Sequence, residues 1–287
     1  MWEVMFWPIV ACILLPGLLV YLGLHVVKRG IIFIDIAMAQ MASLGICTAV
    51  LLHLDLQGWP TFAIALGFTL IGAAVFSITG KRASEVPQEA VIGIAYVVAA
   101  ATAVILLSRS AEGDEEIKNM LVGNILLVSP AEVWKTFGLF LCVGVFHFLT
   151  RKKFLVLSFH REQAREAGMA MRMWDFLFYA TFGLVVTSFV RIVGVLLVFT
   201  YLIVPAVCGV LLAGTFRKRL LIGCAVAIAG GVAGLWISFY ADLPSGAAIV
   251  CVFGGVLVLL GSGVVLARRL KTDGLHSKAE LHEVLEK

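Results

Sequence analysis

Charge is scarce in this sequence. Only 14% of its 287 residues are Asp, Glu, Lys or Arg, whereas 61% are hydrophobic. An ordinary soluble domain carries about 25% charged residues and alternates buried with solvated faces. Long stretches of this chain have no polar face at all, so the composition excludes a water-soluble globular domain and predicts an integral membrane protein.

Several chemical signatures are also lacking. The sequence contains no P-loop, no Gly-rich dinucleotide fingerprint, no His-Glu-x-x-His pair and no Gly-x-Ser-x-Gly element, so we expect neither an enzyme nor a chain that hydrolyses nucleotides by itself. The six cysteines fall within apolar stretches and lack the spacing of a zinc knuckle or a disulfide framework. The net charge of +4 is split among short clusters, which is not the pattern of a nucleic-acid-binding protein.

Most of the sequence consists of apolar stretches long enough to cross a membrane. A spanning helix needs about 20 residues. The stretches run approximately over 6–27, 31–53, 60–79, 89–108, 133–150, 174–190, 192–213, 220–240 and 245–267. The sixth and seventh are separated only by Arg191, where one span could be broken or re-entrant. The sequence therefore predicts an all-α integral membrane protein with eight or nine transmembrane helices in a single domain, 1–270, followed by a tail, 271–287.

Basic residues set the expected orientation, because Lys and Arg are enriched in the cytoplasmic loops of membrane proteins. With nine crossings and the N-terminus outside, every basic cluster lies in the cytoplasm, as does the tail. These clusters are Lys28-Arg29, Lys81-Arg82, 151–153 with Arg161, Arg165 and Arg172, 217–219, and Arg268-Arg269 with Lys271. Asp55, the acidic residues of 112–116 and Asp242 then lie outside.

Two polar segments separate the spans. Segment 151–173 contains helix formers in His-Arg-Glu-Gln-Ala-Arg-Glu-Ala-Gly, with Gly168 where a helix would end. A short cytoplasmic helix of this kind suits a surface on which a soluble partner pushes, or an amphipathic helix that rests on the membrane. Ahead of the fifth span, Ser129, Pro130 and Glu132 form the pattern of a capping box at a helix start.

Several short runs resemble a known family when they are taken together and in order. They are Leu-Val-Gly-Asn-Ile-Leu-Leu-Val-Ser-Pro (121–130), Phe-His-Arg-Glu-Gln-Ala-Arg-Glu-Ala-Gly (159–168), Arg-Ile-Val-Gly-Val-Leu-Leu-Val (191–198) with Val-Pro-Ala (204–206), and Glu-Ala-Val-Ile-Gly (89–93). With these runs, the chain resembles the permease subunit of zinc- and manganese-importing ABC transporters.

The resemblance implies a homodimeric permease in the bacterial plasma membrane, surrounded by lipid. It implies two cytoplasmic ATPase subunits that use ATP, an extracytoplasmic metal-binding protein that delivers zinc or manganese, and no cofactor on this chain. It further implies that segment 151–173 is the coupling helix seated against the ATPase, with His160, Arg161, Glu162, Arg165 and Gly168 in its central part.

The second span departs from the family pattern. The family reads Gly-Asp-Ala-Leu-Ser-His-Ala there, and its Asp and His lie one helical turn apart on one face, where they can hold a divalent ion. This chain reads Phe33-Ile-Asp-Ile-Ala-Met-Ala-Gln-Met-Ala-Ser-Leu-Gly45. When this chain is aligned with the family pattern at Gly45, the family His corresponds to Gln40, and Asp35 lies one residue before the position of the family Asp. The Asp/His pair is therefore not intact, and metal selectivity does not carry over.

Asp35 is nonetheless a candidate pathway and metal-contacting residue, because a charge in a span is costly, about 2.5 to 3.5 kcal/mol at the helix centre. Its alternative is an ion pair with Lys28 or Arg29 near the cytoplasmic interface. Gln40 is a candidate pathway group or an interhelical hydrogen-bonding residue. His53 is a second cation contact by position, and Glu89 is either a pathway carboxylate or a favourable charge at a helix start.

Two other functions stay open from the residues alone. A permease of the same architecture could import a metal chelate or another small solute, since a chelate brings its own ligands. An ion-coupled secondary transporter could use Asp35 or Glu89 as its proton or sodium carrier.

Overall fold

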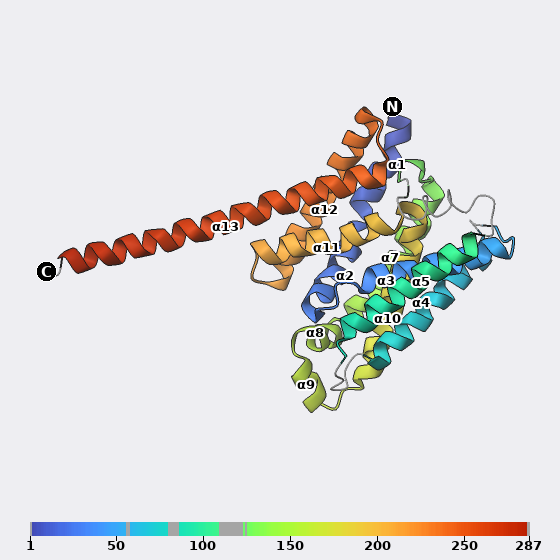
Figure 1. Ribbon diagram of the computed structural model, residues 1–287, viewed down its shortest axis with the longest axis horizontal. Helices are drawn as coiled ribbons and strands as arrows, with labels where there is room; N and C mark the ends of the chain where they lie inside the picture. Colours follow the sequence, from blue (N-terminus) through green and yellow to red (C-terminus); the bar gives the residue numbers. More distant parts are fainter. Residues whose placement is uncertain (1, 56–57, 80–85, 109–122, 124, 286–287) are drawn as a thin grey trace.

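Every regular element that the structure describes is a helix (Figure 1). In this computed structural model the described residues are 2–55, 58–79, 86–108, 123 and 125–285, without the side chains of 2–4 and 267–285. In chain order the elements are α1 (Trp2–Leu14), α2 (Pro16–Arg29), α3 (Ile34–Leu51), α4 (Trp59–Thr79), α5 (Gln88–Leu107), the 3-10 helix η1 (Ile125–Leu127), α7 (Pro130–Leu149), α8 (Arg151–Phe159), α9 (Arg161–Glu166), α10 (Met171–Val193), α11 (Val195–Leu212), α12 (Phe216–Ala241) and α13 (Ser245–Leu285). The expected acidic residues of 112–116 and the pair Lys81-Arg82 lie outside this description.

The number of spans in the structure agrees with the number predicted from the sequence. In the described part of the chain, eight helices are long and apolar enough to cross a membrane, and α1 with α2 makes a ninth if this bent pair is one span. The sixth and seventh predicted spans correspond to α10 and α11, which are two separate helices on either side of Gly194. Gly194 has a φ of +77°, a conformation that glycine adopts without strain.

The bend lies instead in the first span. The axes of α1 and α2 differ by 41° at Leu15, directly before Pro16. Proline has no N–H to donate to the preceding turn and its ring crowds that turn, so a helix usually ends just before it. Pro16 is the sequence signal for the bend, whereas Pro8 lies within α1.

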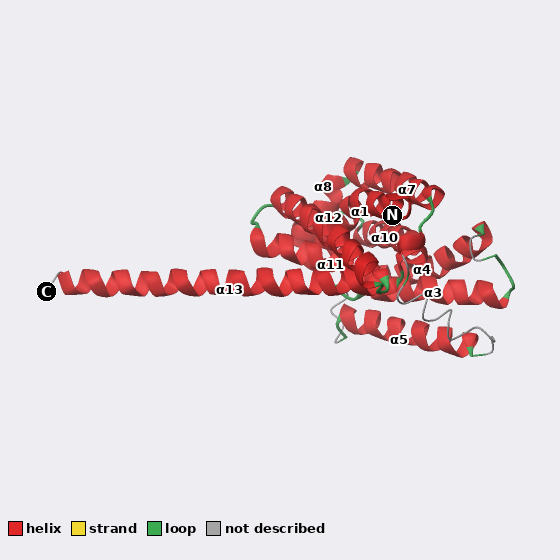
Figure 2. Ribbon diagram, turned by 90° about the horizontal axis from the view of Figure 1, so that it is seen from above, coloured by secondary structure: helices red, strands yellow, loops and turns green. Residues whose placement is uncertain are grey.

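Burial divides the spans into an inner and an outer group. About two-thirds of the most apolar part of α3, α10 and α11 is buried, namely 67%, 61% and 61%. The apolar part of α13 is only 11% buried, and α5 is 22% buried. Figure 2 shows α5 along one edge of the bundle and α13 extending far beyond it. The outer helices therefore expose apolar surface that lipid or another protein must cover.

Close helix packing inside the chain depends on glycine. A Cβ atom on Gly45 of α3 would lie 2.5 Å from the Cα atom of Ala65 in α4, so no side chain fits between these backbones. In α12, a Cβ atom on Gly234 would lie 2.6 Å from the Cα atom of Ile249 in α13. Small residues let transmembrane helices approach closely in this way.

Gly45→Ala should therefore destabilise the protein, because overpacking a close helix contact costs about 1–3 kcal/mol. The measurement is the apparent melting temperature of the purified protein in detergent. Gly67→Ala in α4 is the matched control, since a Cβ atom there meets nothing within 4 Å. We expect a clear drop for Gly45→Ala and no drop for Gly67→Ala; equal melting temperatures would contradict the packing described for α3 and α4.

Candidate functional site

The segment predicted to couple to a partner consists of two short helices, α8 and α9, at the lower end of the molecule in Figure 1. They are separated by His160, whose φ of −135° and ψ of 55° are not helical. Gly168, with a φ of +65°, ends α9: its N–H bonds to the carbonyl of Arg165, and the N–H of Met169 bonds to that of Ala164. These two bonds make a Schellman motif, so the sequence placed the end of this helix correctly.

The side chains of α9 divide between solvent and the bundle. His160 and, within α9, Glu162 and Arg165 are exposed, whereas Ala164 is buried and Arg161 is partly buried. The exposed face is polar and charged, which suits contact with a soluble partner. The inward face is anchored by an ion pair.

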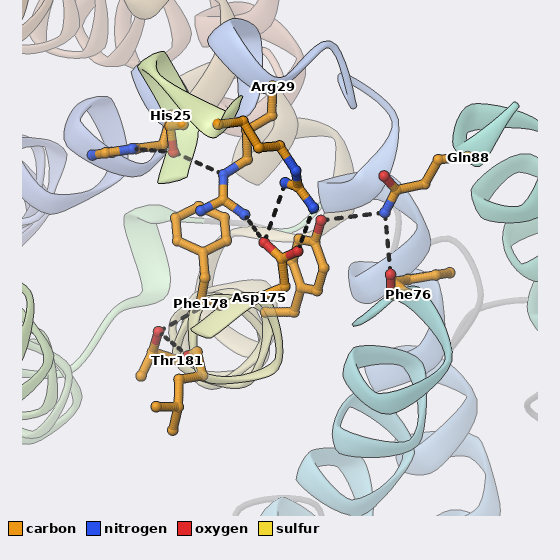
Figure 3. Close-up of polar contacts among 11 residues, drawn as sticks. His25, Arg29, Phe76, Gln88, Asp175, Phe178 and Thr181 are labelled. Carbon is orange, nitrogen blue, oxygen red and sulfur yellow. Dashed lines mark hydrogen bonds and ion pairs between the residues drawn. The ribbon is translucent and has the colours of Figure 1, made fainter. Parts of the chain in front are cut away.

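That ion pair centres on Asp175 of α10 (Figure 3). Oδ1 of Asp175 accepts a hydrogen bond from Nη1 of Arg29 at 2.9 Å, and Oδ2 accepts one from Nη2 of Arg161 at 2.6 Å. The Asp175 and Arg29 side chains are each 3% exposed, and that of Arg161 is 19% exposed. One buried carboxylate therefore joins the end of α2 to α9.

Arg29 makes two further contacts. Its Nε donates to Oγ of Ser158 in α8 at 2.9 Å, and its guanidinium lies over the ring of Phe178, 3.9 Å from the centroid. The hydroxyl of Ser158 also pairs with Nδ1 of His25 at 2.9 Å. Sequence reasoning missed this cluster. The available signal was one acidic residue next to many basic ones on the same side of the membrane.

Asp35 lies in the first turn of α3 and is 1% exposed. Its Oδ1 accepts a hydrogen bond from the N–H of Ile36 at 2.7 Å, while Oδ2 has no hydrogen-bond partner within the described residues. The alternative of an ion pair with Lys28 or Arg29 is wrong, because Arg29 binds Asp175 and the Lys28 ammonium lies 5.5 Å from the centroid of the Phe159 ring. Asp35 is thus a deeply buried carboxyl group, and one of its oxygens has no hydrogen-bond partner among the described residues.

The other predicted pathway residues of α3 do not all join Asp35. Gln40 is buried in the same helix, one turn before Ser43, and these two share a face. His53 follows the end of α3, is exposed and has a φ of +54°. The 18 residues of α3 span about 27 Å, so Asp35 and His53 lie at opposite ends and cannot bind one ion together.

Glu89 is brought to the turn between α2 and α3. Glu89 lies in the first turn of α5, and its Oε1 accepts a hydrogen bond from the N–H of Ile32 at 2.7 Å. The neighbouring Gln88 donates to the hydroxyl of Tyr179 and to the carbonyl of Phe76, both at 3.2 Å (Figure 3). Glu89 therefore positions the turn that leads into Asp35, in addition to its favourable place at a helix start.

The opposite end of the bundle holds a cavity of about 380 Å³ between the starts of α4 and α7 and the end of α10. Its lining includes Trp59, Phe62, Glu132, Lys135 and Arg191. Glu132 also completes the predicted capping box: Oγ of Ser129 accepts from its N–H at 3.2 Å, and its Oε2 accepts from the N–H of Ser129 at 2.8 Å. Trp59 and Trp134 are exposed at this end, as tryptophans are at a membrane interface.

This architecture defines a class of protein. A bundle of eight or nine helices that are long and apolar enough to cross a membrane is a multi-pass membrane protein, and this one has a buried carboxyl group in a span and a polar two-helix segment at one end.

Comparison with known proteins gives the family. Residues 1–262 match the model of the ABC 3 transport family, so the chain belongs to that family and is a permease of the bacterial plasma membrane.

Individual relatives agree with this assignment. The chain is 30% identical over 189 residues to the manganese transport system membrane protein MntC of Listeria innocua, covering 63% of this chain and 67% of that one. It is 27% identical over 206 residues to the chelated iron transport system membrane protein YfeD of Yersinia pestis, covering 71% and 69%. The fold resembles that of PsaBC from Streptococcus pneumoniae in complex with Fab, with a TM-score of 0.76, 22% identity and 90% coverage of each chain.

The contact between Glu89 and Ile32 predicts a local change on substitution. Glu89→Ala removes the acceptor, whereas Glu89→Gln keeps an oxygen in the same place. A hydrogen bond to a charged group contributes about 1.5–3 kcal/mol, so the Ile32 amide should exchange its hydrogen at least about ten-fold faster in Glu89→Ala. Hydrogen–deuterium exchange of the peptide over 30–34 measures this, with Glu89→Gln, which keeps an uncharged acceptor, falling between wild type and Glu89→Ala. Equal exchange in all three proteins would rule out the contact.

Proposed function

We propose that this chain is the membrane-spanning subunit of an ABC importer for a divalent metal ion, manganese or zinc, with ATP hydrolysed by a partner subunit. The observation that carries the proposal is the buried Asp35 carboxyl group, which has one oxygen without a hydrogen-bond partner among the described residues. A carboxyl group in a span is costly unless it has a function, and carboxylate oxygens are ligands for divalent ions such as manganese.

The family and the printed names of relatives support the substrate. Three of the most similar curated relatives are named manganese transport system membrane protein MntC, in two Listeria species and in Halalkalibacterium halodurans. Others are named for iron or chelated iron, so a chelate permease is the second candidate. The missing Asp/His pair favours that second candidate, because a chelated metal needs fewer protein ligands.

The proposed mechanism is alternating access. Two copies of the chain line a central pathway, with their outer helices against each other and against lipid. Cytoplasmic ATPase subunits bind the exposed face of α8 and α9, around His160, Glu162 and Arg165. An extracytoplasmic metal-binding protein docks at the opposite end, where His53 and the cavity near Arg191 lie. Closure of the ATPase pair then moves the helices that hold Asp35.

Among the described residues, no three His, Cys, Asp or Glu side chains gather into a metal-binding cluster. In the proposed mechanism the ion is cargo, held in passing by Asp35, by hydroxyl or amide oxygens such as those of Gln40 and Ser43, and by water. Weak binding of this kind suits transport, because the ion must also leave.

The first test is the metal content of whole cells, measured by elemental mass spectrometry. A strain without this protein should contain less manganese or zinc, and the wild-type gene should restore it. Asp35→Asn keeps the size of the side chain and its acceptor for Ile36, but it removes the charge. We expect uptake to fall about ten-fold or more in Asp35→Asn, which corresponds to about 1.4 kcal/mol of lost stabilisation.

Gln40→Ala at matched expression is the comparison variant, and it should restore most of the metal content, since a neutral amide is a weak ligand. A deficit limited to iron supplied as a chelate would favour the second candidate. If no metal changes in the deletion strain, the proposal of a metal importer fails.

A further inference from the structure

We propose that Asp175 is the joint that transmits movement of α8 and α9 to the turn before Asp35, and that Arg161 and Arg29 are positioning residues for transport. None of the three contacts the transported ion in this proposal. The inference rests on the proposed function, because only a permease driven by a partner ATPase requires such a joint.

The first step is the link from the surface to the bundle. Arg161 is the first residue of α9, and its guanidinium reaches Oδ2 of Asp175 at 2.6 Å. α9 is bounded by the non-helical His160 on one side and by the turn at Gly168 on the other. The chain is not helical on either side of α9, so the position of α9 depends on the contacts of its side chains with the bundle. The ion pair described among these contacts is the one that Arg161 makes with Asp175.

The second step is the link from Asp175 to α2. Arg29 is the last residue of α2, and it donates to Oδ1 of Asp175 at 2.9 Å. The Arg29 side chain also donates a hydrogen bond to Ser158 of α8, and its guanidinium lies over the ring of Phe178 of α10. The last turn of α2 is therefore attached to α8, to α10 and, through Asp175, to α9. His25 lies one helical turn earlier on the same face and attaches to Ser158 as well.

The third step leads from α2 to the pathway. Gly30 follows Arg29 in the left-handed conformation, and the N–H of Ile31 bonds back to the carbonyl of Val26. Glu89 then holds the N–H of Ile32 at 2.7 Å, and α3 begins at Ile34 with Asp35 in its first turn. Every element between Arg29 and Asp35 is thus hydrogen-bonded, so a displacement of the end of α2 displaces the start of α3.

The charges explain why this contact is suited to a joint. Two guanidinium groups share one carboxylate in a site that excludes most water, and a buried ion pair is strongly destabilised when one partner is removed or pulled away. In the proposal this contact is either closed, as in the structure, or broken when α9 is displaced. Coupling between distant sites requires an element that has two arrangements of this kind.

The test uses the purified permease with its ATPase partner in lipid nanodiscs or proteoliposomes. Metal uptake and ATP hydrolysis are measured together, with manganese as the probe. For Arg161→Gln we expect ATP hydrolysis within about two-fold of wild type, but at least about ten-fold less metal transported per ATP. Arg161→Lys keeps the charge and should restore part of the coupling. Lys218→Gln, an exposed basic residue in the first turn of α12, is the charge-matched control and should transport like wild type.

A second readout follows the joint directly. Addition of ATP to the wild-type complex should change hydrogen exchange in the peptide over 30–34, and Arg161→Gln should abolish that change. An unchanged ratio of metal to ATP in Arg161→Gln, or an unchanged response of the 30–34 peptide, overturns the joint. If Arg161→Gln does not assemble with the ATPase, Arg161→Lys decides: full loss of assembly there also overturns it.

The proposed function can fail separately. If the wild-type complex neither transports manganese nor hydrolyses ATP in response to any divalent metal, the metal importer itself is refuted. If the wild type couples transport to ATP and Arg161→Gln couples equally well, only the joint is refuted.

Discussion

Hydrocarbon provides no hydrogen bonds, and most of this structure follows from that constraint. Each buried backbone N–H and C=O must find a partner within the chain, so the spanning segments are helices whose bonds are internal. Where a helix stops, a local device takes over: the capping box of Ser129 and Glu132, the Schellman turn at Gly168, and the glycine between α10 and α11. The first of these starts α7, the second ends α9, and the third separates α10 from α11.

The same constraint gives meaning to the few charges inside the bundle. Arg29 and Asp175 are each 3% exposed and are paired, so their cost is offset by each other. Asp35 is equally buried, and one of its oxygens has no described partner. Paired charges hold helices together, whereas a buried carboxyl oxygen without a partner is the observation on which the proposed role of Asp35 rests. The two sites are connected through the end of α2 and the turn held by Glu89.

Local patterns in the sequence predicted much of this fold. The apolar stretches gave eight or nine spans, Ser129-Pro130-Ala131-Glu132 gave a helix start, and Gly168 gave a helix end, because each depends on residues close in the chain. The bend at Pro16 was missed although its signal was local.

The cluster of Arg29, Asp175 and Arg161 was not predicted, because its members come from three elements and meet only in the folded bundle. For the same reason the sequence left open whether Asp35 is paired with Arg29. Only the tertiary contact of Arg29 with Asp175 answers that question. Gln40, His53 and Glu89 were chosen by position along the spans, and position alone did not show that they lie in three different places.

We propose that this chain is a permease driven by a separate ATPase. The most direct measurement is native mass spectrometry of the complex purified from cells in mild detergent through a tag on this chain. The account predicts an assembly of two copies of the chain with two copies of an ATPase subunit. A species that contains this chain without any ATPase, under conditions that preserve a known ABC transporter, would contradict it.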